Sequence, residues 1–339
     1  MQRRTLGKSG LGVSVIGFGG IPIQKLRMSE ARSLLEEALD AGINFFDTAQ
    51  GYGDSEVKIG EAVRKRRKEC ILATKSPCRT ADEAVSHVKK ALRRLKTDYI
   101  DLYQIHHVSK PHELEEVLAP GGAIEGLIRL KKEGKIKHVG ITGHTPDVLC
   151  KALEKSEELE TVQFPFNIIE DGENERGLLE IAKKLEVGTI IMKPLAGGVI
   201  PEPELSLRWI LQQEADVVIP GMVLSREVKI NAALGDEPCP VSPQELSRLK
   251  AKIRALESNF CRRCMYCEPC PEEIPIYFIQ ELGDKVKVAT VKDMCQRQYA
   301  SLEKTVEDCN GCGECEEKCP YELPIREMLK EKHRLLVES

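Results

Sequence analysis

Short apolar runs rich in β-branched residues alternate with longer amphipathic stretches over the first 235 residues of the chain. The short runs predict strands, and the longer stretches predict helices because their apolar residues recur every three or four positions. The predicted strands are residues 13–17, 44–47, 70–74, 100–105, 138–142, 161–164, 188–192 and 216–219. Eight strand–helix units in about 240 residues are typical of a (β/α)8 TIM barrel, an α/β fold that we expect here.

Residues 29–41 show the helical pattern. The apolar positions Ala31, Leu34, Leu35, Ala38 and Leu39 follow the spacing of a single helix face. Ser29 is the predicted N-cap, because its hydroxyl can accept a bond from a free N–H at the helix start. Gly42 is the predicted C-terminal stop.

A doubly wound open sheet is the alternative arrangement of these elements. Its dinucleotide fingerprint, G-x-G-x-x-G, is absent after the first predicted strand, where residues 17–20 read GFGG. The residues before Val13 include Gly7, Ser9 and Gly10 and predict a small hairpin that closes the bottom of the barrel.

Prolines interrupt the pattern after residue 235. They are Pro238, Pro240 and Pro243. A helix is predicted over residues 243–256, because its apolar residues share one face. Those residues are Leu246, Leu249, Ile253 and Leu256. We therefore expect a barrel over 1–235, a linker and helix over 236–258, and a separate small domain over 259–339.

Eight of the thirteen cysteines fall in two runs within the last of these segments. The first run is Cys261, Cys264, Cys267 and Cys270, and the second is Cys309, Cys312, Cys315 and Cys319. The second run, with the proline that follows it, is the C-x2-C-x2-C-x3-C-P pattern of bacterial 4Fe–4S ferredoxins. The first run has one residue fewer before its last cysteine.

Crossed ligation of two 4Fe–4S clusters is the expected use of these runs. Three thiolates spaced by two residues surround one cluster, whereas the cysteine before the proline is carried toward the other. One cluster would then have Cys261, Cys264, Cys267 and Cys319 as ligands. The other would have Cys309, Cys312, Cys315 and Cys270.

Three other uses of the cysteines remain open. Disulfides suit a secreted chain, but the N-terminal stretch MQRRTLGKSGLG has no apolar core of a signal peptide. Zinc usually takes two separated pairs of ligands rather than one tight run. A single cluster would leave several cysteines unused. Cys70, Cys78, Cys150, Cys239 and Cys295 lie outside the runs and are expected to be mostly small buried hydrophobes, with Cys295 a less favoured substitute ligand.

Composition excludes several classes of protein. The formal net charge is −4 with 31% charged residues of mixed sign, which argues against a nucleic-acid partner. No stretch approaches the roughly 18 consecutive apolar residues of a membrane span, so no membrane association is expected. Reduced thiols predict a cytoplasmic location.

Four polar residues lie at or just after the ends of neighbouring predicted strands, where barrel enzymes carry their chemistry. They are Asp47, Tyr52, Lys75 and His106. A phenol is a poor acid at neutral pH, but a nearby lysine favours its phenolate, and an aspartate keeps that lysine charged and in place. A histidine can donate a hydrogen bond to a carbonyl oxygen. Each residue alone could serve structure, whereas all four together can protonate the alkoxide formed when a hydride attacks a carbonyl.

These residues carry a resemblance to a known family. Residues 46–53 (FDTAQGYG), 73–75 (ATK) and 101–106 (DLYQIH) resemble the aldo-keto reductase signature. The resemblance implies a TIM barrel that binds NAD(P)H and reduces a small carbonyl substrate. It implies Tyr52 as general acid, Lys75 and Asp47 as the pair that tunes it, and His106 as the residue that orients the carbonyl. His107 competes for that last role, but the two-residue alternation of a strand favours His106.

The resemblance also implies contacts to the nicotinamide end of the cofactor. Gln163 matches an amide that binds the nicotinamide carboxamide. Thr142 and Gly143 stand where the family usually has Ser and Asn, and Met192 stands where many members stack a tyrosine.

Further contacts are implied for the rest of the dinucleotide. The loop over the pyrophosphate would contain Pro194, Leu195, Gly197 and Gly198. Gly221 begins the adenosine-binding segment, and Asn231 matches its adenine contact. NADPH-specific members carry basic residues at the positions of Gly221 and Glu227, so the choice between NAD(H) and NADP(H) is open and tilted to NAD(H).

The barrel followed by two cysteine runs is similar to a subgroup of aldo-keto reductases with a ferredoxin-like domain. Clusters move single electrons whereas nicotinamide moves a hydride, so the clusters could serve an electron-transfer partner protein, sense redox state or stabilise the small domain. Two functions therefore remain: a carbonyl reductase with an appended iron–sulfur module, and an electron-transfer or redox-sensing protein whose barrel only binds nucleotide. The intact set of four strand-end residues favours the first.

Overall fold

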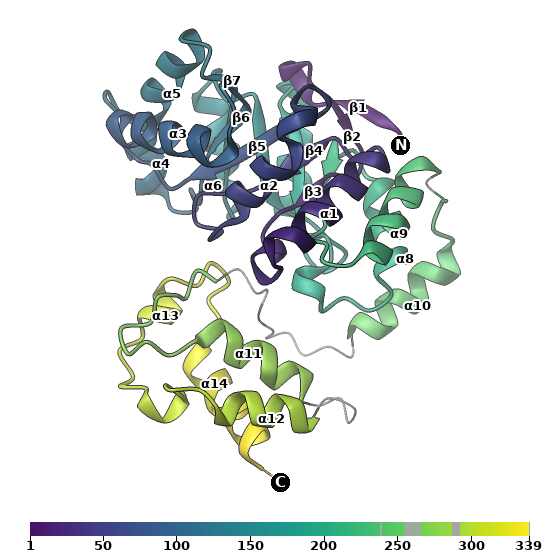
Figure 1. The fold of residues 1–339 in the computed structure, drawn as a ribbon, viewed down its shortest axis with the longest axis vertical. Coiled ribbons are helices and arrows are strands. Elements are labelled where there is room, and N and C mark those ends of the chain that lie inside the picture. The colour runs from purple at the N-terminus through teal and green to yellow at the C-terminus, as the bar shows by residue number, and fades with distance from the viewer. Residues whose placement is uncertain (238, 255–260, 262–264, 287–291, 339) are drawn as a thin grey trace. The chain divides into compact units, whose positions relative to one another are not determined.

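The structure is a computed structural model that describes residues 1–237, 239–254, 261, 265–286 and 292–338. The chain divides into two compact units, Met1–Ala255 and Leu256–Ser339 (Figure 1). The first unit includes helix α10 (Pro243–Arg254), which the sequence pattern predicts as the helix after the linker. Leu249 on the apolar face of this helix is fully buried.

Eight parallel strands form one sheet in the order of the chain, from β3 to β10. They are β3 (Phe18–Gly19), β4 (Phe45–Asp47), β5 (Ile71–Ser76), β6 (Ile100–Ile105), β7 (Ile136–Thr142), β8 (Thr161–Pro165), β9 (Gly188–Met192) and β10 (Val217–Val218). Backbone bonds from Gly17 N to Val218 O (2.8 Å) and from Gly19 N to Pro220 O (3.0 Å) join the first strand to the last. The sheet is thus closed, and the predicted TIM barrel is confirmed.

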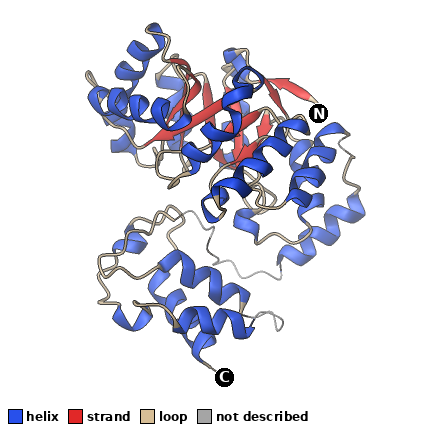
Figure 2. Cartoon of the chain, in the orientation of Figure 1, coloured by secondary structure: helices blue, strands red, loops and turns tan. Residues whose placement is uncertain are grey.

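Helices follow the strands and surround the sheet (Figure 2). They are α1 (Met28–Asp40), α2 (Ser55–Val63), α3 (Ala81–Leu95), α4 (Pro111–Leu118), α5 (Ala123–Lys132), α6 (Pro146–Lys155), α7 (Glu173–Lys184), α8 (Pro203–Leu211) and α9 (Ser225–Asp236). All five apolar residues predicted for the inner face of α1 are buried. Gly42 follows the helix with a φ of 87°, a left-handed conformation that suits glycine and ends the helix as predicted.

The predicted N-cap of α1 is wrong by two residues. The cap is Arg27, because the carboxylate of Glu30 accepts the backbone N–H of Arg27 at 2.8 Å. This bond lets the helix begin at Met28, so that Ser29 lies inside its first turn.

The first predicted strand is also divided in the structure. Its beginning belongs to β2 (Gly12–Ser14), which pairs with β1 (Arg3–Thr5) in an antiparallel hairpin. Hydrogen bonds to and from side chains account for the end of β2 at Ser14. Ser14 Oγ donates to the carbonyl of Ile16 (2.7 Å), and Asn44 Oδ1 accepts the N–H of Ser14 (2.7 Å). Leu6 and Val13 of the hairpin pack against inward-facing barrel residues, which confirms the predicted closure of the barrel bottom.

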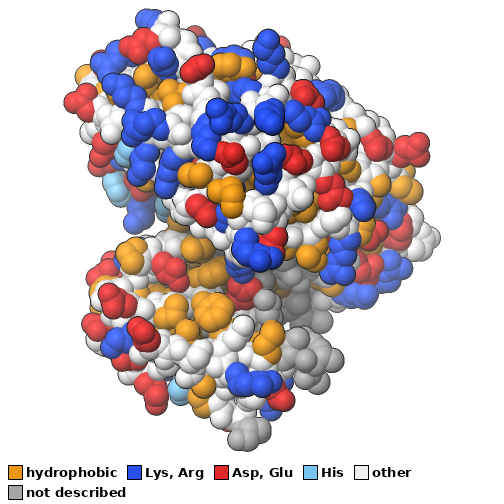
Figure 3. All heavy atoms as spheres, viewed as in Figure 1, with side chains coloured by type: hydrophobic (Ala, Val, Ile, Leu, Met, Phe, Trp, Pro, Cys, Tyr) orange, Lys and Arg blue, Asp and Glu red, His pale blue; other side chains and the backbone are white. Residues whose placement is uncertain are grey.

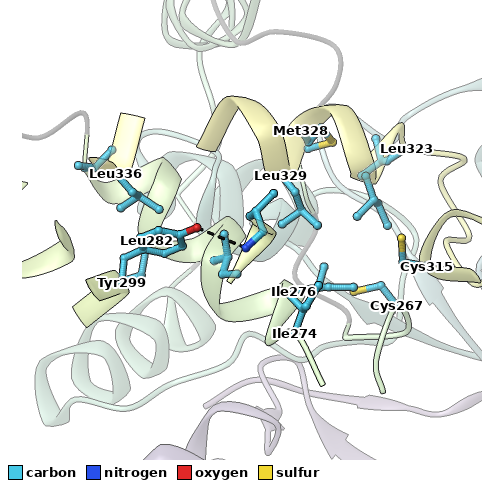
Figure 4. Close-up of a cluster of buried hydrophobic side chains, with 14 of the residues drawn as sticks. Cys267, Ile274, Ile276, Leu282, Tyr299, Cys315, Leu323, Met328, Leu329 and Leu336 are labelled. Atoms are coloured by element: carbon cyan, nitrogen blue, oxygen red, sulfur yellow. Dashed lines mark hydrogen bonds between the residues drawn. The ribbon is translucent and has the colours of Figure 1, made fainter. Parts of the chain in front are cut away.

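The described part of the second unit consists of helices and the loops that connect them. It contains α11 (Ile276–Lys285), α12 (Lys292–Ala300), the short α13 (Glu314–Glu317) and α14 (Ile325–Val337). These helices enclose a hydrophobic core, with Cys267 and Cys315 at one end and Tyr299 and Leu336 at the other (Figure 4). This unit therefore has apolar packing of its own in addition to its cysteines.

Charged side chains of both signs are interspersed over the face of the first unit seen in Figure 3, which agrees with the mixed composition. In the described part of the chain, no helix combines the length and the apolar character that crossing a bilayer requires.

Candidate active site and cysteine cavities

An ion pair lies inside the barrel at the ends of two neighbouring strands. Lys75 Nζ is 2.7 Å from both carboxylate oxygens of Asp47 and donates a third bond to the carbonyl of Thr48 at 2.9 Å. Asp47 pairs in register with Ala73, and the strand alternation places Lys75 on the same inner face as Ala73. Asp47 is 2% exposed and Lys75 is fully buried.

Tyr52 and His106 complete the group. Tyr52 lies in the loop after β4, with its ring centre 5.2 Å from Lys75 Nζ. The His106 ring meets the Tyr52 ring edge to face, with centres 6.0 Å apart. His106 follows β6 directly, and its backbone N–H extends the ladder by donating to Ser76 O at 2.9 Å. The structure thus brings together all four residues that the strand ends predicted.

Burial shifts the pKa values of the ionisable side chains in this group. It raises the pKa of Asp47, against the opposing charge and hydrogen bonds of Lys75. It lowers the pKa of Lys75, against the opposing charge of Asp47. Burial, assisted by the charge of Lys75, also lowers the pKa of His106 well below its ordinary value. His106 is therefore neutral at pH 7, and one of its two ring nitrogens carries a proton.

Gln104 is a buried residue of this region that the sequence patterns did not single out. Its Nε2 donates to Gln163 Oε1 at 2.7 Å, and Gln163 in turn hydrogen-bonds Asp47. Both glutamines are buried, and Gln163 Nε2 also lies 3.8 Å from Met192 Sδ. The sequence could have identified Gln104, because it is a polar residue two positions before His106 and therefore lies on the same inward face of an otherwise apolar strand.

Further basic side chains lie beside His106. His107 and His144 meet edge to face with ring centres 6.0 Å apart, while His106 rather than His107 faces Tyr52. Arg79 donates to the carbonyls of His106 (3.1 Å) and His107 (2.8 Å) and so fixes the end of β6. The pKa values of all three histidines are lowered, chiefly by burial, and the charge of Lys193 adds to this. His144, Arg79 and Lys193 were not predicted, because none of them belongs to the motifs at the strand ends.

Cysteines of the second unit surround two separate cavities. The first is lined by Cys261, Cys267 and Cys319. The second is lined by Cys270, Cys309, Cys312 and Cys315. Cys264 lies outside the described residues. Ile276 lines both cavities, so the two are neighbours.

The donor chemistry of both cavities suits iron–sulfur clusters, because thiolates are the ligands that such clusters take. Within the described ranges, no three His, Cys, Asp or Glu side chains converge as they would on a single metal ion. Cys295 is fully buried in the hydrophobic core and is not among the residues that line either cavity. Cys70 and Cys78 are buried as expected, whereas Cys150 is partly exposed and Cys239 is exposed.

Residues 15–204 match the aldo/keto reductase family. The chain belongs to this family. Residues 260–324 match a 4Fe-4S dicluster domain. The predicted family and the iron–sulfur module are thereby confirmed, and the chain is an oxidoreductase of the aldo/keto reductase type.

Individual relatives support the assignment. The chain is similar to the 6-dehydroglucose reductase of Novosphingobium aromaticivorans, with 30% identity over 78% of this chain and 93% of the relative. It is also similar to the solved structure of aldo-keto reductase AKR11C1 from Bacillus halodurans, with a TM-score of 0.65 and 28% identity over 74% of this chain and 96% of that one. An aldo-keto reductase from Klebsiella pneumoniae, solved in complex with NADPH, has a TM-score of 0.63 and 25% identity over 74% of this chain and 95% of its own.

In this aldo/keto reductase, several residues expected to contact the nicotinamide have a chemistry that suits such a group. Thr142 Oγ1 at the end of β7 is buried and has no hydrogen-bond partner in the described part of the chain, so it can bond a ligand amide. Met192 ends β9 and is 8% exposed. In the turn that follows, Gly197 and Gly198 have φ values of 73° and 89°, and without a Cβ they allow a ligand close to the backbone.

The segment expected to hold the adenosine follows β10. A Cβ on Gly221 would lie 2.5 Å from Pro22 Cγ, so a side chain there requires Pro22 to move. Glu227 accepts the backbone N–H groups of Val223 (2.7 Å) and Leu224 (3.0 Å), and so caps α9. Asn231 is buried on the same helix. The predicted roles of these residues remain predictions.

Proposed function

We propose that this aldo/keto reductase interconverts a small carbonyl compound and its alcohol with NAD(P)H and that it carries two 4Fe–4S clusters. The observation that supports the first part best is the position of Tyr52, whose ring lies beside both Lys75 and His106. When bound, NAD(P)H supplies the hydride, and the carbonyl, hydride and one proton together give the alcohol.

Tyr52 supplies that proton in the proposed mechanism. Its hydroxyl gives the proton to the carbonyl oxygen, and the charge of Lys75 stabilises the phenolate that remains. The buried carboxylate of Asp47 holds Lys75 in this place. His106, being neutral, donates a hydrogen bond to the carbonyl oxygen and orients it. In the oxidative direction the same phenolate takes the proton back.

The cysteine cavities support the second part of the proposal. The first cavity combines Cys261 and Cys267 of the first run with Cys319 of the second. The second cavity combines Cys270 with three cysteines of the second run. This is the partition that crossed ligation requires. Because the thiols must stay reduced, we further propose a reducing compartment such as the cytoplasm.

Tyr52→Phe tests the proposed reaction. Under anaerobic conditions, aldehyde-dependent NAD(P)H oxidation should fall by at least ~100-fold in kcat, the usual effect of a positioned acid, while nucleotide still binds. Tyr103→Phe is the matched control, because Tyr103 is a buried tyrosine whose hydroxyl donates to Ser76 at 2.8 Å away from this group. It should retain kcat within about threefold, since it removes no transition-state contact. Near-normal turnover in Tyr52→Phe would remove Tyr52 from the mechanism.

A further inference from the structure

Gln280 has a buried side chain with no hydrogen-bond partner among the residues that the structure describes. It lies on α11 and is 2% exposed, and neither its Oε1 nor its Nε2 is paired. Buried amides in folded proteins are almost always hydrogen-bonded, because an unpaired one loses its bonds to water without replacement. Such a residue therefore indicates a partner other than the described side chains, for example a group held in a cavity that the residue lines.

Gln280 lines the first cysteine cavity, which shows where that partner belongs. The same cavity is lined by the three cysteines named above and by seven further described residues, most of them apolar. Those seven are Met265, Ile276, Tyr277, Tyr321, Leu323, Ile325 and Met328. None of these residues is an aspartate, a glutamate, a lysine or an arginine. Apart from the two tyrosine hydroxyls, the polar groups of this lining are thiols, so a group bound by those thiols would share the cavity with the amide of Gln280.

We propose that Gln280 donates a hydrogen bond from Nε2 to a sulfur of the iron–sulfur cluster in the first cavity, and thereby raises the reduction potential of that cluster. The inference rests on the proposed two-cluster function. Reduction adds negative charge to the cluster and its sulfurs, so a donor at a sulfur stabilises the reduced form more than the oxidised form. Gln280 is in this respect a tuning residue and not a ligand.

In the described lining of the second cavity, no buried side-chain amide lacks a hydrogen-bond partner. Asn310 Nδ2 donates to Glu272 at 2.7 Å, and Asn310 Oδ1 accepts the N–H of Cys312 at 2.9 Å. Arg326 donates to Glu316 at 2.6 Å and to the carbonyl of Gly311 at 3.1 Å. Gln280 lines the first cavity and is not among the lining residues of the second, so its effect should be confined to one of the two clusters.

Gln280→Leu tests the proposal in the full-length protein with clusters reconstituted under anaerobic conditions. The midpoint potentials are measured by redox titration followed by electron paramagnetic resonance. We expect the equilibrium constant for reduction of one cluster to fall at least tenfold, which lowers its midpoint potential by about 59 mV for a one-electron couple. The equilibrium constant for reduction of the other cluster should change by no more than about twofold. Gln298→Leu, at an exposed position of α12, is the control and should move neither potential.

The possible results separate the inference from the function on which it rests. Two unchanged potentials in a protein with about eight irons per chain would overturn the role of Gln280 and leave the two-cluster proposal intact. A value near four irons would overturn the two-cluster proposal itself.

A second measurement on the wild-type protein tests the proposal even if Gln280→Leu fails to assemble its clusters. The wild-type protein is prepared with ¹⁵N in its glutamine side-chain amides, and the reduced clusters are examined by pulsed electron paramagnetic resonance. A ¹⁵N coupling at one cluster is expected, because a hydrogen bond carries spin density to the donor nitrogen. Absence of such a coupling would contradict the proposal.

Discussion

Lys75 and Asp47 form an ion pair in which the ammonium nitrogen is 2.7 Å from each carboxylate oxygen, with both side chains buried. Removal of one partner leaves the other charge buried and uncompensated, which typically costs about 3–5 kcal/mol. Each partner thus contributes to the stability of the folded barrel, by neutralising the charge of the other, as well as to the proposed chemistry.

The first prediction separates these two contributions. Lys75→Met should lower both kcat, by at least ~100-fold, and the free energy of unfolding, by about 3 kcal/mol. The double variant Asp47→Asn/Lys75→Met should regain much of the stability, since no buried charge remains, but none of the activity. Unfolding of the barrel can be followed by the fluorescence of Trp209, the single tryptophan of the chain.

Lys58→Met is the matched control for this experiment. Lys58 is equally buried but binds Asp54 and the carbonyls of Ile23 and Gln24. This variant should lose stability while the folded fraction keeps its kcat. A comparable loss of kcat in the control would show that the effect of Lys75→Met is structural.

The second prediction concerns pH. The pKa of His106 lies well below its ordinary value of 6.5 in the folded chain, chiefly through burial. Below pH 6.5 the unfolded chain therefore binds a proton at this residue that the folded chain does not, so stability falls as the pH falls. His106→Gln should make the free energy of unfolding depend less steeply on pH between 6.5 and about 5, by up to one proton.

Chemical denaturation at several pH values measures this slope. His144 keeps its own contribution, because burial lowers its pKa in the same direction. His112→Gln, at an exposed position on α4, serves as the control for the substitution of histidine by glutamine. An unaltered slope in His106→Gln would show that His106 titrates alike in the folded and unfolded chains.

The third prediction concerns the choice of nucleotide. Glu227 places a carboxylate where NADPH-specific relatives are expected to have a basic residue, so the preference for NADPH over NADH should not exceed ~100-fold, about 2.7 kcal/mol. Glu227→Gln keeps an oxygen for the cap of α9 and removes the charge. It should shift the ratio of dissociation constants toward NADPH by several-fold, up to about tenfold, because repulsion of the 2′-phosphate is removed.

Fluorescence titration with both nucleotides provides the measurement. Glu125→Gln is the control, because Glu125 accepts the backbone N–H of Gly121 at the start of α5 in a comparable way. A strong preference for NADPH in the wild-type protein would instead indicate a phosphate contact from the neighbouring Arg226.

The fourth prediction concerns the cluster ligands. Anaerobic analysis should give about eight irons and eight sulfides per chain. Cys319→Ser should perturb the cluster of the first cavity, together with any effect of Gln280, whereas Cys312→Ser should perturb the other. Spectra in which both substitutions disturb the same cluster would show that ligation is not crossed.

Local sequence patterns predicted much of the fold and the candidate site. The buried face of α1 and most strand positions follow from periodicity, because burial repeats with the period of the element. Asp47, Lys75 and His106 could be predicted to meet because neighbouring parallel strands end at the same edge of the barrel.

Contacts between distant residues account for what the patterns missed. The bond from Ser14 to Asn44 joins residues 30 positions apart and ends β2 early. The bond from Gln104 to Gln163 spans 59 positions. Gln280 looks like an ordinary polar residue of an amphipathic helix until the cavity beside it is known. None of these contacts has a local spacing from which it could be inferred.

The distribution of cysteines between the two cavities has a consequence for biosynthesis. The first cavity takes Cys319 from the far end of the domain, and the second takes three cysteines from beyond residue 308. While the ribosome is still adding those residues, the nascent chain offers neither cavity a full set of thiols. Under crossed ligation both cofactors would therefore be inserted after the barrel has been synthesised, and a ribosome that stops between residues 271 and 308 would release a chain with an intact barrel sequence and no complete cluster site.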